Sequence, residues 1–409
     1  MAAAVTMVAG AASKASSGSR TLTGNRTLTG NRTLELPAGV YRTPLYGGIN
    51  DYAYYFVDVL VGNPPSRQSV ILDSGSSLLG FPCTTCGRRC GRHIDSPFDL
   101  AASSSSQTYT CRDQRCVSTE SCSEAGQCRY SQVYSEGSSI EGFFFSDVLS
   151  LAASDPGRPN PRVRYDYIGC HNKETVLFTS QQASGILGVS FPRGGKQPTV
   201  MDGFMGAPGA RRRQFAICAA EDGGVLLIGG YDASLNKASF SKNGSSTFTS
   251  RWLRGWNKLP ATVDQANRDI VWAKMVNNNA YAISVSGIST LTPAAEPGAS
   301  PKYNKLVERG FGEVLVDSGT TYTYLPNEVY QKVARYLIDV CNNNNVARDD
   351  QRAGQCMRSK QDLVCFDFSA TSLPIPTLLQ RLPSLSLELT DGAVIEWNPE
   401  SYLFRKTDT

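Results

Sequence analysis

The sequence predicts a mostly β protein built from two lobes, and three observations lead to this fold class. Short runs of β-branched and aromatic residues alternate with turns rich in Gly, Pro, Asn and Ser. Helical patterns are few, and the clearest is the stretch 327–341. An apolar strand that ends on an aspartate occurs twice, far apart in the chain, as expected if two similar lobes each contribute one copy.

The expected strands follow one another from residue 54 onward. The first two flank a tight turn, Asn63-Pro64-Pro65-Ser66, and their apolar content predicts that both are buried. The later runs have the same composition and end at glycine-rich or polar segments, which predicts a succession of sheet strands. The expected strand regions are 54–62, 68–75, 142–151, 163–170, 215–232, 280–290 and 311–326.

The chain divides into three expected regions. Residues 1–44 are rich in Ala, Ser, Thr and Gly and predict a disordered leader or prosegment. Residues 45–235 are expected to form the N-terminal lobe and 236–409 the C-terminal lobe. The leader repeats Arg-Thr-Leu, at Arg20, Arg26 and Arg32.

Charge and cysteine usage restrict the class of protein. A net charge of +4 over 409 residues argues against nucleic acid as a partner, and no apolar run is long enough to span a membrane. Seven of the twelve cysteines lie in the segment 83–128, which favours a disulfide-linked insertion in an oxidising compartment. Because seven is odd, one of them must pair outside the segment or stay free. Zinc held by Cys83, Cys86, Cys90 and His93 is the alternative.

The two aspartate motifs agree position by position. Asp73 follows the strand Val70-Ile71-Leu72 and precedes Ser74-Gly75-Ser76, whereas Asp317 follows Val314-Leu315-Val316 and precedes Ser318-Gly319-Thr320. A single Asp-Ser-Gly is ordinary turn chemistry, but two copies at the ends of buried strands predict a functional pair.

Two neighbouring carboxylates that share one proton can activate water. The ionised member acts as a general base, and the protonated member polarises the carbonyl of a peptide bond. The hydroxyls of Ser76 and Thr320 are expected to donate to the carboxylates, while Ser74 and Ser318 join the loops. With two histidines in the whole chain, a Ser-His or Cys-His mechanism has little support. We therefore predict peptide hydrolysis by Asp73 and Asp317 without a metal or other cofactor.

On these motifs the segment 52–402 resembles the pepsin-like aspartic proteases. The resemblance implies a bilobal fold with an active-site cleft between the lobes, and a flap hairpin in 132–147 that carries Tyr134. It also implies that Ala183-Ser184-Gly185-Ile186-Leu187-Gly188 supports the first aspartate loop. Gly80 lies where many members of the family carry a tryptophan against the flap tyrosine.

Within the family, the cysteine cluster, the flap and the segment 181–188 are similar to plasmepsin V and its apicomplexan relatives. This resemblance implies an endopeptidase of the secretory pathway, in the endoplasmic reticulum or Golgi, that processes exported proteins at Arg-x-Leu motifs. Glu136 and Gln181 or Gln182 would then hold the substrate arginine. The Arg-Thr-Leu repeats suggest self-processing of the leader.

The remaining expectations concern partners and the C-terminal end. The resemblance implies a monomer that binds peptide or protein substrates in extended form. After Tyr402 the sequence lacks the family's second supporting element and last strand, so the C-terminal lobe is expected to be truncated. The alternative function is a catalytically inactive peptide-binding protein on the same fold.

Overall fold

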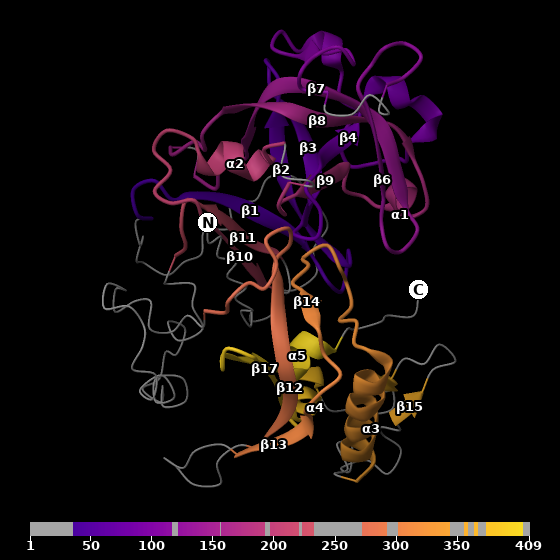
Figure 1. Ribbon diagram of the computed structural model, residues 1–409, viewed down its shortest axis with the longest axis vertical. Coiled ribbons are helices and arrows are strands. Elements are labelled where there is room, and N and C mark those ends of the chain that lie inside the picture. The colour runs from indigo at the N-terminus through magenta and orange to yellow at the C-terminus, as the bar shows by residue number, and fades with distance from the viewer. Residues whose placement is uncertain are drawn as a thin grey trace. The chain divides into compact units, whose positions relative to one another are not determined.

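The computed structural model describes residues 36–116, 122–155, 157–192, 197–220, 223–232, 272–292, 302–343, 356–358, 364–366 and 374–403. The chain separates into two compact units (Figure 1). The first contains the described residues up to 232 together with Asp317–Thr321, and the second contains those from 272 to 316 and from 322 onward. The lobe boundary expected at 235/236 lies outside the described residues and stays a prediction.

The first unit is organised around one sheet of eleven strands, which runs in the order β10-β11-β1-β2-β3-β9-β4-β8-β7-β5, with β6 paired to β7. Short helices connect some of them: the 3-10 helices η1 (Thr84–Arg89) and η2 (Leu100–Ala102), and the α-helices α1 (Leu177–Ser180) and α2 (Val200–Met205). The strands are β1 (Tyr41–Gly48), β2 (Tyr54–Val61), β3 (Ser66–Asp73), β4 (Leu79–Pro82), β5 (Gln107–Thr108), β6 (Arg129–Val133), β7 (Ser139–Leu151), β8 (Val163–Glu174), β9 (Gly185–Gly188), β10 (Phe215–Ala220) and β11 (Gly223–Ile228).

Strand β1 begins earlier than the sequence suggested. Tyr41 pairs with Ile228 of β11, so residues 41–44 belong to the folded unit. The sequence predicted that these residues belong to the leader. Burial explains the difference, because Val40 packs with Ala216 and Leu227 in a small apolar cluster. The three Arg-Thr-Leu repeats lie outside the described residues.

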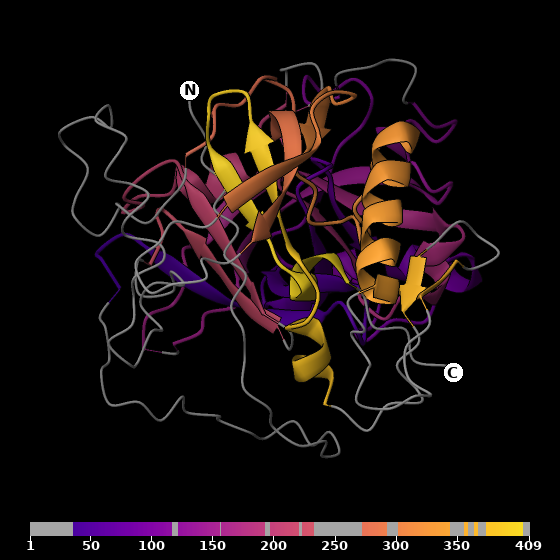
Figure 2. The same cartoon turned by 90° about the horizontal axis from the view of Figure 1, so that it is seen from below.

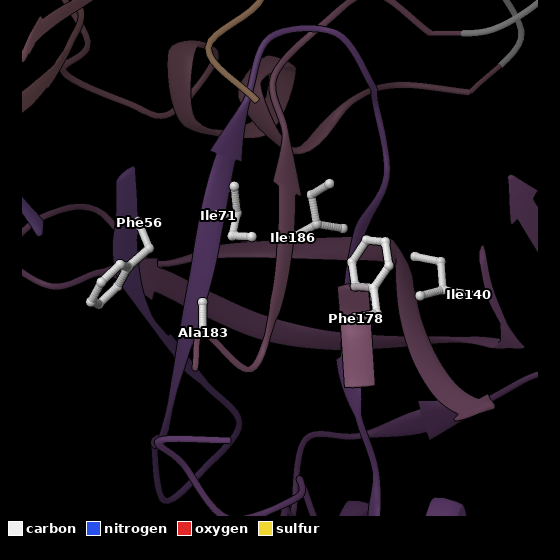
Figure 3. Packing of buried hydrophobic residues seen from close by; sticks show 6 residues of the cluster. All are labelled: Phe56, Ile71, Ile140, Phe178, Ala183 and Ile186. Carbon is white, nitrogen blue, oxygen red and sulfur yellow. The ribbon is translucent and has the colours of Figure 1, made fainter. Parts of the chain in front are cut away.

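Strand β3 carries the first aspartate through the middle of the sheet. It pairs antiparallel with β2 and parallel with β9, and Gln68 to Asp73 are all buried. A strand enclosed on both sides needs apolar side chains on both faces, which accounts for the run Val70-Ile71-Leu72. Ile71 and Ile186 lie opposite each other in the β3–β9 pairing and pack with Phe56, Ile140, Phe178 and Ala183 (Figure 3).

The second unit has a smaller sheet, in the order β13-β12-β17-β18 with β14 also paired to β12. Figure 2 shows the hairpin of β17 and β18 in yellow beside the long orange strand β12. Its strands are β12 (Ala282–Thr292), β13 (Lys302–Val307), β14 (Glu313–Leu315), β17 (Ser384–Leu389) and β18 (Val394–Trp397), with a separate pair β15 (Cys356–Arg358) and β16 (Val364–Phe366). Its helices are α3 (Asn327–Asn343), α4 (Ile375–Leu379) and α5 (Pro399–Tyr402).

Helix α3 confirms the helical pattern expected at 327–341. Its buried residues Val329, Val333 and Leu337 recur every four positions and pack against Ile288 of β12 and Leu385 of β17. This spacing places one apolar stripe of the helix on the sheet. Among the residues that the structure describes, no helix is both long and apolar enough to cross a bilayer.

Candidate active site

Asp73 is the last residue of β3, and the neighbouring strand β9 holds it in place. Asp73 lies opposite Gly188, and the Val189 amide donates to the Asp73 carbonyl over 2.8 Å. One residue later, the Ser190 amide donates to the carbonyl of Ser76, also over 2.8 Å. The segment that follows Ala183 therefore supports the first aspartate loop, as the family resemblance implied.

Asp73 is 5% exposed, and its carboxylate accepts hydrogen bonds from its own turn. The Gly75 amide donates to Oδ1 over 2.9 Å, and the Ser76 hydroxyl donates to Oδ2. Because donors that point at a carboxylate favour its ionised form, they offset part of the cost of burying it.

Asp317 repeats this arrangement. The Gly319 amide donates to its Oδ1 over 2.8 Å, and the Thr320 hydroxyl donates to its Oδ2 over 2.5 Å. Residues 317–321 group with the first unit by their contacts, although most of the neighbouring sequence belongs to the second. Thr321 also donates to the Ala53 carbonyl over 2.8 Å.

Reciprocal hydrogen bonds join the two loops through the serines that follow the aspartates. The Ser74 amide donates to the Ser318 hydroxyl over 3.0 Å, and the Ser318 amide donates to the Ser74 hydroxyl over 2.8 Å. The Ser318 hydroxyl in turn donates to the Leu72 carbonyl over 2.7 Å. The side-chain hydroxyls therefore align the ends of two distant segments.

The glycine of each loop faces the carboxylate of the other. A methyl group on Gly75 would come within 2.6 Å of Asp317 Oδ2, and one on Gly319 would overlap Asp73 Oδ1. Any larger residue at either position would therefore separate the carboxylates. This crossed arrangement explains why glycine occupies both turns.

The electrostatics of the pair favour a shared proton. Burial raises the pKa of Asp73 most, and the charge of Asp317 raises it further, against the hydrogen bonds from Ser76 and Gly75; the result is a pKa of about 7. Two carboxylates so close together cannot both ionise at low cost. The two carboxyl groups therefore titrate as a pair that shares one proton.

Tyr134 lies at the tip of the hairpin formed by β6 and β7. Its amide donates to the Ser138 carbonyl over 2.9 Å, and the Gly137 amide donates back to its carbonyl over 3.0 Å, which closes the turn. Its ring packs on Phe178 of α1 with 5.2 Å between centroids. The His171 ring fills the space beside Gly80, where many members of the family carry a tryptophan. A Cβ on Gly80 would lie 2.7 Å from His171 Nε2.

The three proposed arginine-binding residues lie in the hairpin turn and in the segment after α1, where each bonds to close neighbours. Glu136 is exposed and accepts a hydrogen bond from Ser138 in the same turn. Gln181 is half-buried, and its side-chain amide donates to the Ala183 carbonyl over 3.4 Å. Gln182 is exposed, and its backbone amide donates to the Tyr54 hydroxyl over 3.0 Å. Their role in binding arginine stays a prediction.

The cysteine segment forms disulfides. Cys86 pairs with Cys90, Cys111 with Cys122 and Cys116 with Cys128, while Cys83 pairs with the distant Cys170. Six of the seven cysteines therefore pair within the segment and the seventh pairs outside it. The three cysteines of the zinc alternative are all consumed, so they cannot serve as thiolate ligands.

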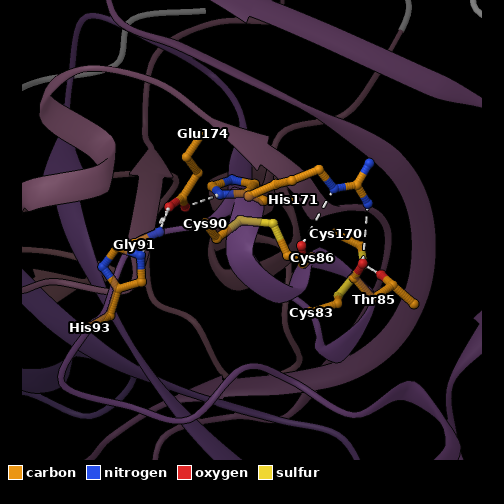
Figure 4. The surroundings of a disulfide bond; sticks show 10 residues. Cys83, Thr85, Cys86, Cys90, Gly91, His93, Cys170, His171 and Glu174 are labelled. Carbon is orange, nitrogen blue, oxygen red and sulfur yellow. Dashed lines mark hydrogen bonds and ion pairs between the residues drawn. A yellow bond between two sulfur atoms is a disulfide. The ribbon is translucent and has the colours of Figure 1, made fainter.

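Sequence reasoning missed a buried group formed by both histidines and Glu174. His171 Nδ1 lies 2.9 Å from Glu174 Oε1, and His93 Nε2 lies 3.0 Å from Glu174 Oε2 (Figure 4). The side chains of His171 and Glu174 are fully buried, and that of His93 is 2% exposed. The Cys83–Cys170 bond brings the two histidine segments together, but the sequence alone does not give this pairing.

Comparison with known proteins agrees with this geometry. The family descriptions "Xylanase inhibitor N-terminal" and "Xylanase inhibitor C-terminal" match residues 55–230 and 280–409. The chain therefore belongs to the pepsin-like aspartic protease family, and its mostly β fold agrees with this assignment.

Three relatives carry protease names. Aspartic protease 5 of Toxoplasma gondii is 38% identical over 307 residues, and plasmepsin V of Plasmodium falciparum is 30% identical over 410. Aspartic proteinase nepenthesin-2 of Nepenthes gracilis is 25% identical over 335 residues. The matches cover 69%, 90% and 80% of this chain, but only 30%, 65% and 64% of the relatives' own lengths.

Proposed function

We propose that this protein is an aspartic endopeptidase in which Asp73 and Asp317 activate a water molecule to hydrolyse peptide bonds. The observation that carries the proposal is the crossed pair of loops, in which each carboxylate faces the glycine of the other loop. The names of the relatives support the same reaction class.

The two carboxyl groups take different roles in this mechanism. Asp73, with its raised pKa, is the acid that polarises the substrate carbonyl and later protonates the leaving amine. Asp317 supplies the negative charge that draws a proton from the water. The hydroxyls of Ser76 and Thr320 each hold one carboxylate oxygen, Oδ2, and thereby fix the orientation of the two carboxyl groups.

The decisive experiment replaces each aspartate by asparagine. Asp73→Asn and Asp317→Asn should each lower kcat by at least about a thousandfold, as expected when one member of an acid–base pair is lost. Asp58→Asn is the matched control, because Asp58 is a buried aspartate on β2 that bonds to Ser69 over 2.9 Å. Circular dichroism must show that all three variants are folded. Full activity in either site variant would overturn the assignment.

The proposed substrates are secretory or exported proteins cleaved at Arg-x-Leu motifs. The disulfides support an oxidising secretory compartment, and the motif is what the resemblance of the cysteine cluster, the flap and the segment 181–188 implies. Glu136 offers an exposed carboxylate beside Tyr134 that can pair with a guanidinium. Peptides with Arg replaced by Lys or Ala should lose most of their kcat/KM, and Glu136→Gln should remove that preference. Equal cleavage of all three peptides would reject the motif.

A peptide-binding protein without catalysis is the second candidate, and the inhibitor description of the family favours it. The two candidates differ in turnover. A peptide with a statine-like tetrahedral group should bind the protease much more tightly than the matching substrate. If the substrate binds equally well and survives intact, the binding function is correct.

A further inference from the structure

Residues 91–96, which we call the strap, bind four separate segments of the first unit. The Gly91 amide donates to Glu174 of β8 over 3.0 Å, and the Ile94 amide donates to the Gln182 carbonyl over 2.8 Å. Two strap residues bind β3. The Asp95 carboxylate accepts from Arg67 (2.8 Å) and from the Ser69 amide (2.7 Å), and the Ser96 carbonyl accepts from Gln68 (3.1 Å). Asp95 also accepts from Ser184, the residue before β9, over 3.1 Å.

His93 is the only strap residue that contacts both β8 and the segment 177–182 through its side chain. Its Nε2 lies 3.0 Å from Glu174 Oε2, and its Nδ1 lies 3.1 Å from the Gln181 carbonyl oxygen. A carbonyl oxygen can only accept a hydrogen bond. Glu174 Oε2 accepts from the Gly91 amide, and the hydrogen bonds around Glu174 lower its pKa despite burial, so the carboxylate is ionised and can only accept. Both ring nitrogens of His93 must therefore carry a proton.

His171 differs from His93 in its protonation. Its Nδ1 donates to Glu174 Oε1, and among the described residues its buried Nε2 has no hydrogen-bond partner. A neutral ring with the proton on Nδ1 satisfies these contacts. The buried group then contains one cation, His93, and one anion, Glu174, so its charges balance.

The segment held by His93 also supports the hairpin tip. Phe178 of α1 is 4% exposed and packs against Tyr134, and Gln181 follows three residues later. Thr175, next to Glu174, accepts a hydrogen bond from the amide of Ser139, the first residue of β7 after the hairpin turn, over 2.8 Å. The strap, the 177–182 segment and the hairpin are thus connected through buried contacts.

We propose that His93, held as an imidazolium between Glu174 and the Gln181 carbonyl, is a positioning residue that fixes the 177–182 segment on which Tyr134 packs. The inference rests on the proposed function in assigning this segment to substrate binding. It adds a requirement for a protonated histidine remote from the aspartates. When His93 loses its proton, one ring nitrogen faces an acceptor with a lone pair, and the Gln181 contact is lost.

The groups that face His93 act together on its titration. Burial alone would lower the pKa of His93, but Glu174 outweighs it and raises the pKa above the usual value. Burial lowers the pKa of His171, and the hydrogen bonds of both histidines bring the pKa of Glu174 down to about 2 despite its burial. Tyr130 of β6 also faces Glu174 and stays neutral because burial raises its pKa. The positioning is present below the pKa of His93 and lost as the pH rises through it.

Nuclear magnetic resonance of the wild-type protein tests the protonation directly. The chain has two histidines, so histidine labelled with nitrogen-15 in the ring yields two sets of signals, which His93→Gln assigns by removing one. At pH 7 we expect the His93 ring to carry two protons and the His171 ring one, on Nδ1. A neutral His93 ring at pH 7 would overturn the inference. This measurement does not depend on proteolysis.

Peptide kinetics test the positioning role. A glutamine amide cannot donate in two opposite directions, so His93→Gln should raise KM about tenfold, the size of one charge-assisted hydrogen bond, and change kcat little. Arg92→Gln is the control, because Arg92 is exposed on the same strap.

KM of the wild type should rise with pH as His93 deprotonates, and KM of His93→Gln should not. A fall in kcat at constant KM, or no change, would reject the role. If the protein cleaves no peptide, the proposed function fails, and the dissociation constant of the statine-like peptide replaces KM.

Discussion

At the scale of single residues, Asp73 combines burial with a neighbouring negative charge. Both raise its pKa, to about 7 from a usual value of 3.8. Between these values the folded state holds a proton that the unfolded chain has released, so stability falls as the pH rises toward 7. The same arrangement that prepares the carboxyl group for catalysis therefore destabilises the protein at neutral pH.

Asp73→Asn should consequently stabilise the protein while abolishing activity. Above pH 7 we expect a gain on the order of 1–3 kcal/mol in the free energy of unfolding, because the amide carries no charge to bury. The gain should disappear below about pH 4, where Asp73 is protonated in both states. Urea unfolding at pH 4 and pH 7.5 measures both values. Equal differences at the two pH values would contradict the raised pKa.

Ser76 acts on the same titration in the opposite direction. Its hydroxyl favours the ionised carboxylate and so lowers the pKa of Asp73. In the wild type, kcat/KM should fall above about pH 7. Ser76→Ala should move this fall to higher pH by about half a unit to one unit and lower kcat. Ser131→Ala, on an exposed position of β6, should leave the pH profile unchanged.

At the scale of secondary structure, the contact of β9 with the aspartate loop requires a residue without a side chain. A Cβ at Gly188 would lie 2.5 Å from the Leu78 nitrogen and 2.6 Å from the Ser77 nitrogen. Both atoms belong to the backbone, so relief requires movement of the loop itself. The β3–β9 pairing and the geometry of Asp73 thus depend on the same glycine.

Gly188→Ala should therefore lower both stability and activity. We expect a loss of about 1–3 kcal/mol in the free energy of unfolding, as for overpacking in a buried site. Gly203→Ala is the matched control on α2, where the nearest atom to a Cβ is 3.6 Å away. It should stabilise the protein by about 0.5–1 kcal/mol, because alanine favours a helix. Chemical denaturation of both variants compares them, and a tolerant Gly188 would show that the loop can shift.

The elements also show which sequence predictions held. The strand that ends on Asp73 and the helix at 327–341 follow from local patterns, whereas the support by 185–188 was implied by the family resemblance. The start of β1 does not follow from a local pattern. The segment 41–44 is short and mixes polar and apolar residues, and it becomes a strand through its pairing with β11.

At the scale of the whole molecule, disulfides tie the cysteine segment to the sheet. The Cys83–Cys170 bond joins residues 87 apart in sequence, next to the β4–β8 pairing, whereas Cys86–Cys90 spans only 4. Closing a long loop removes more conformational entropy from the unfolded chain than closing a short one.

Removal of the long-range bond should therefore cost more. In the chain-entropy estimate, the pair Cys83→Ala and Cys170→Ala loses about 4–5 kcal/mol and the pair Cys86→Ala and Cys90→Ala about 2. Guanidinium unfolding of the two double variants measures the difference. Since Cys170 precedes His171, the first variant should also disturb the nitrogen-15 signals of the histidine rings. Equal losses would mean that local packing, not loop closure, dominates.

By itself, the sequence determined the fold class and the disulfide character of the segment 83–128, and it singled out the two aspartates as a predicted pair. Each follows from a repeated or dense local pattern that rarely arises by chance. Only the tertiary structure decided that 317–321 groups with the first unit, that Cys83 reaches Cys170, and that both histidines share Glu174. These features depend on burial and on pairing between distant segments, and the side chains involved carry no periodic signal that a single sequence could reveal.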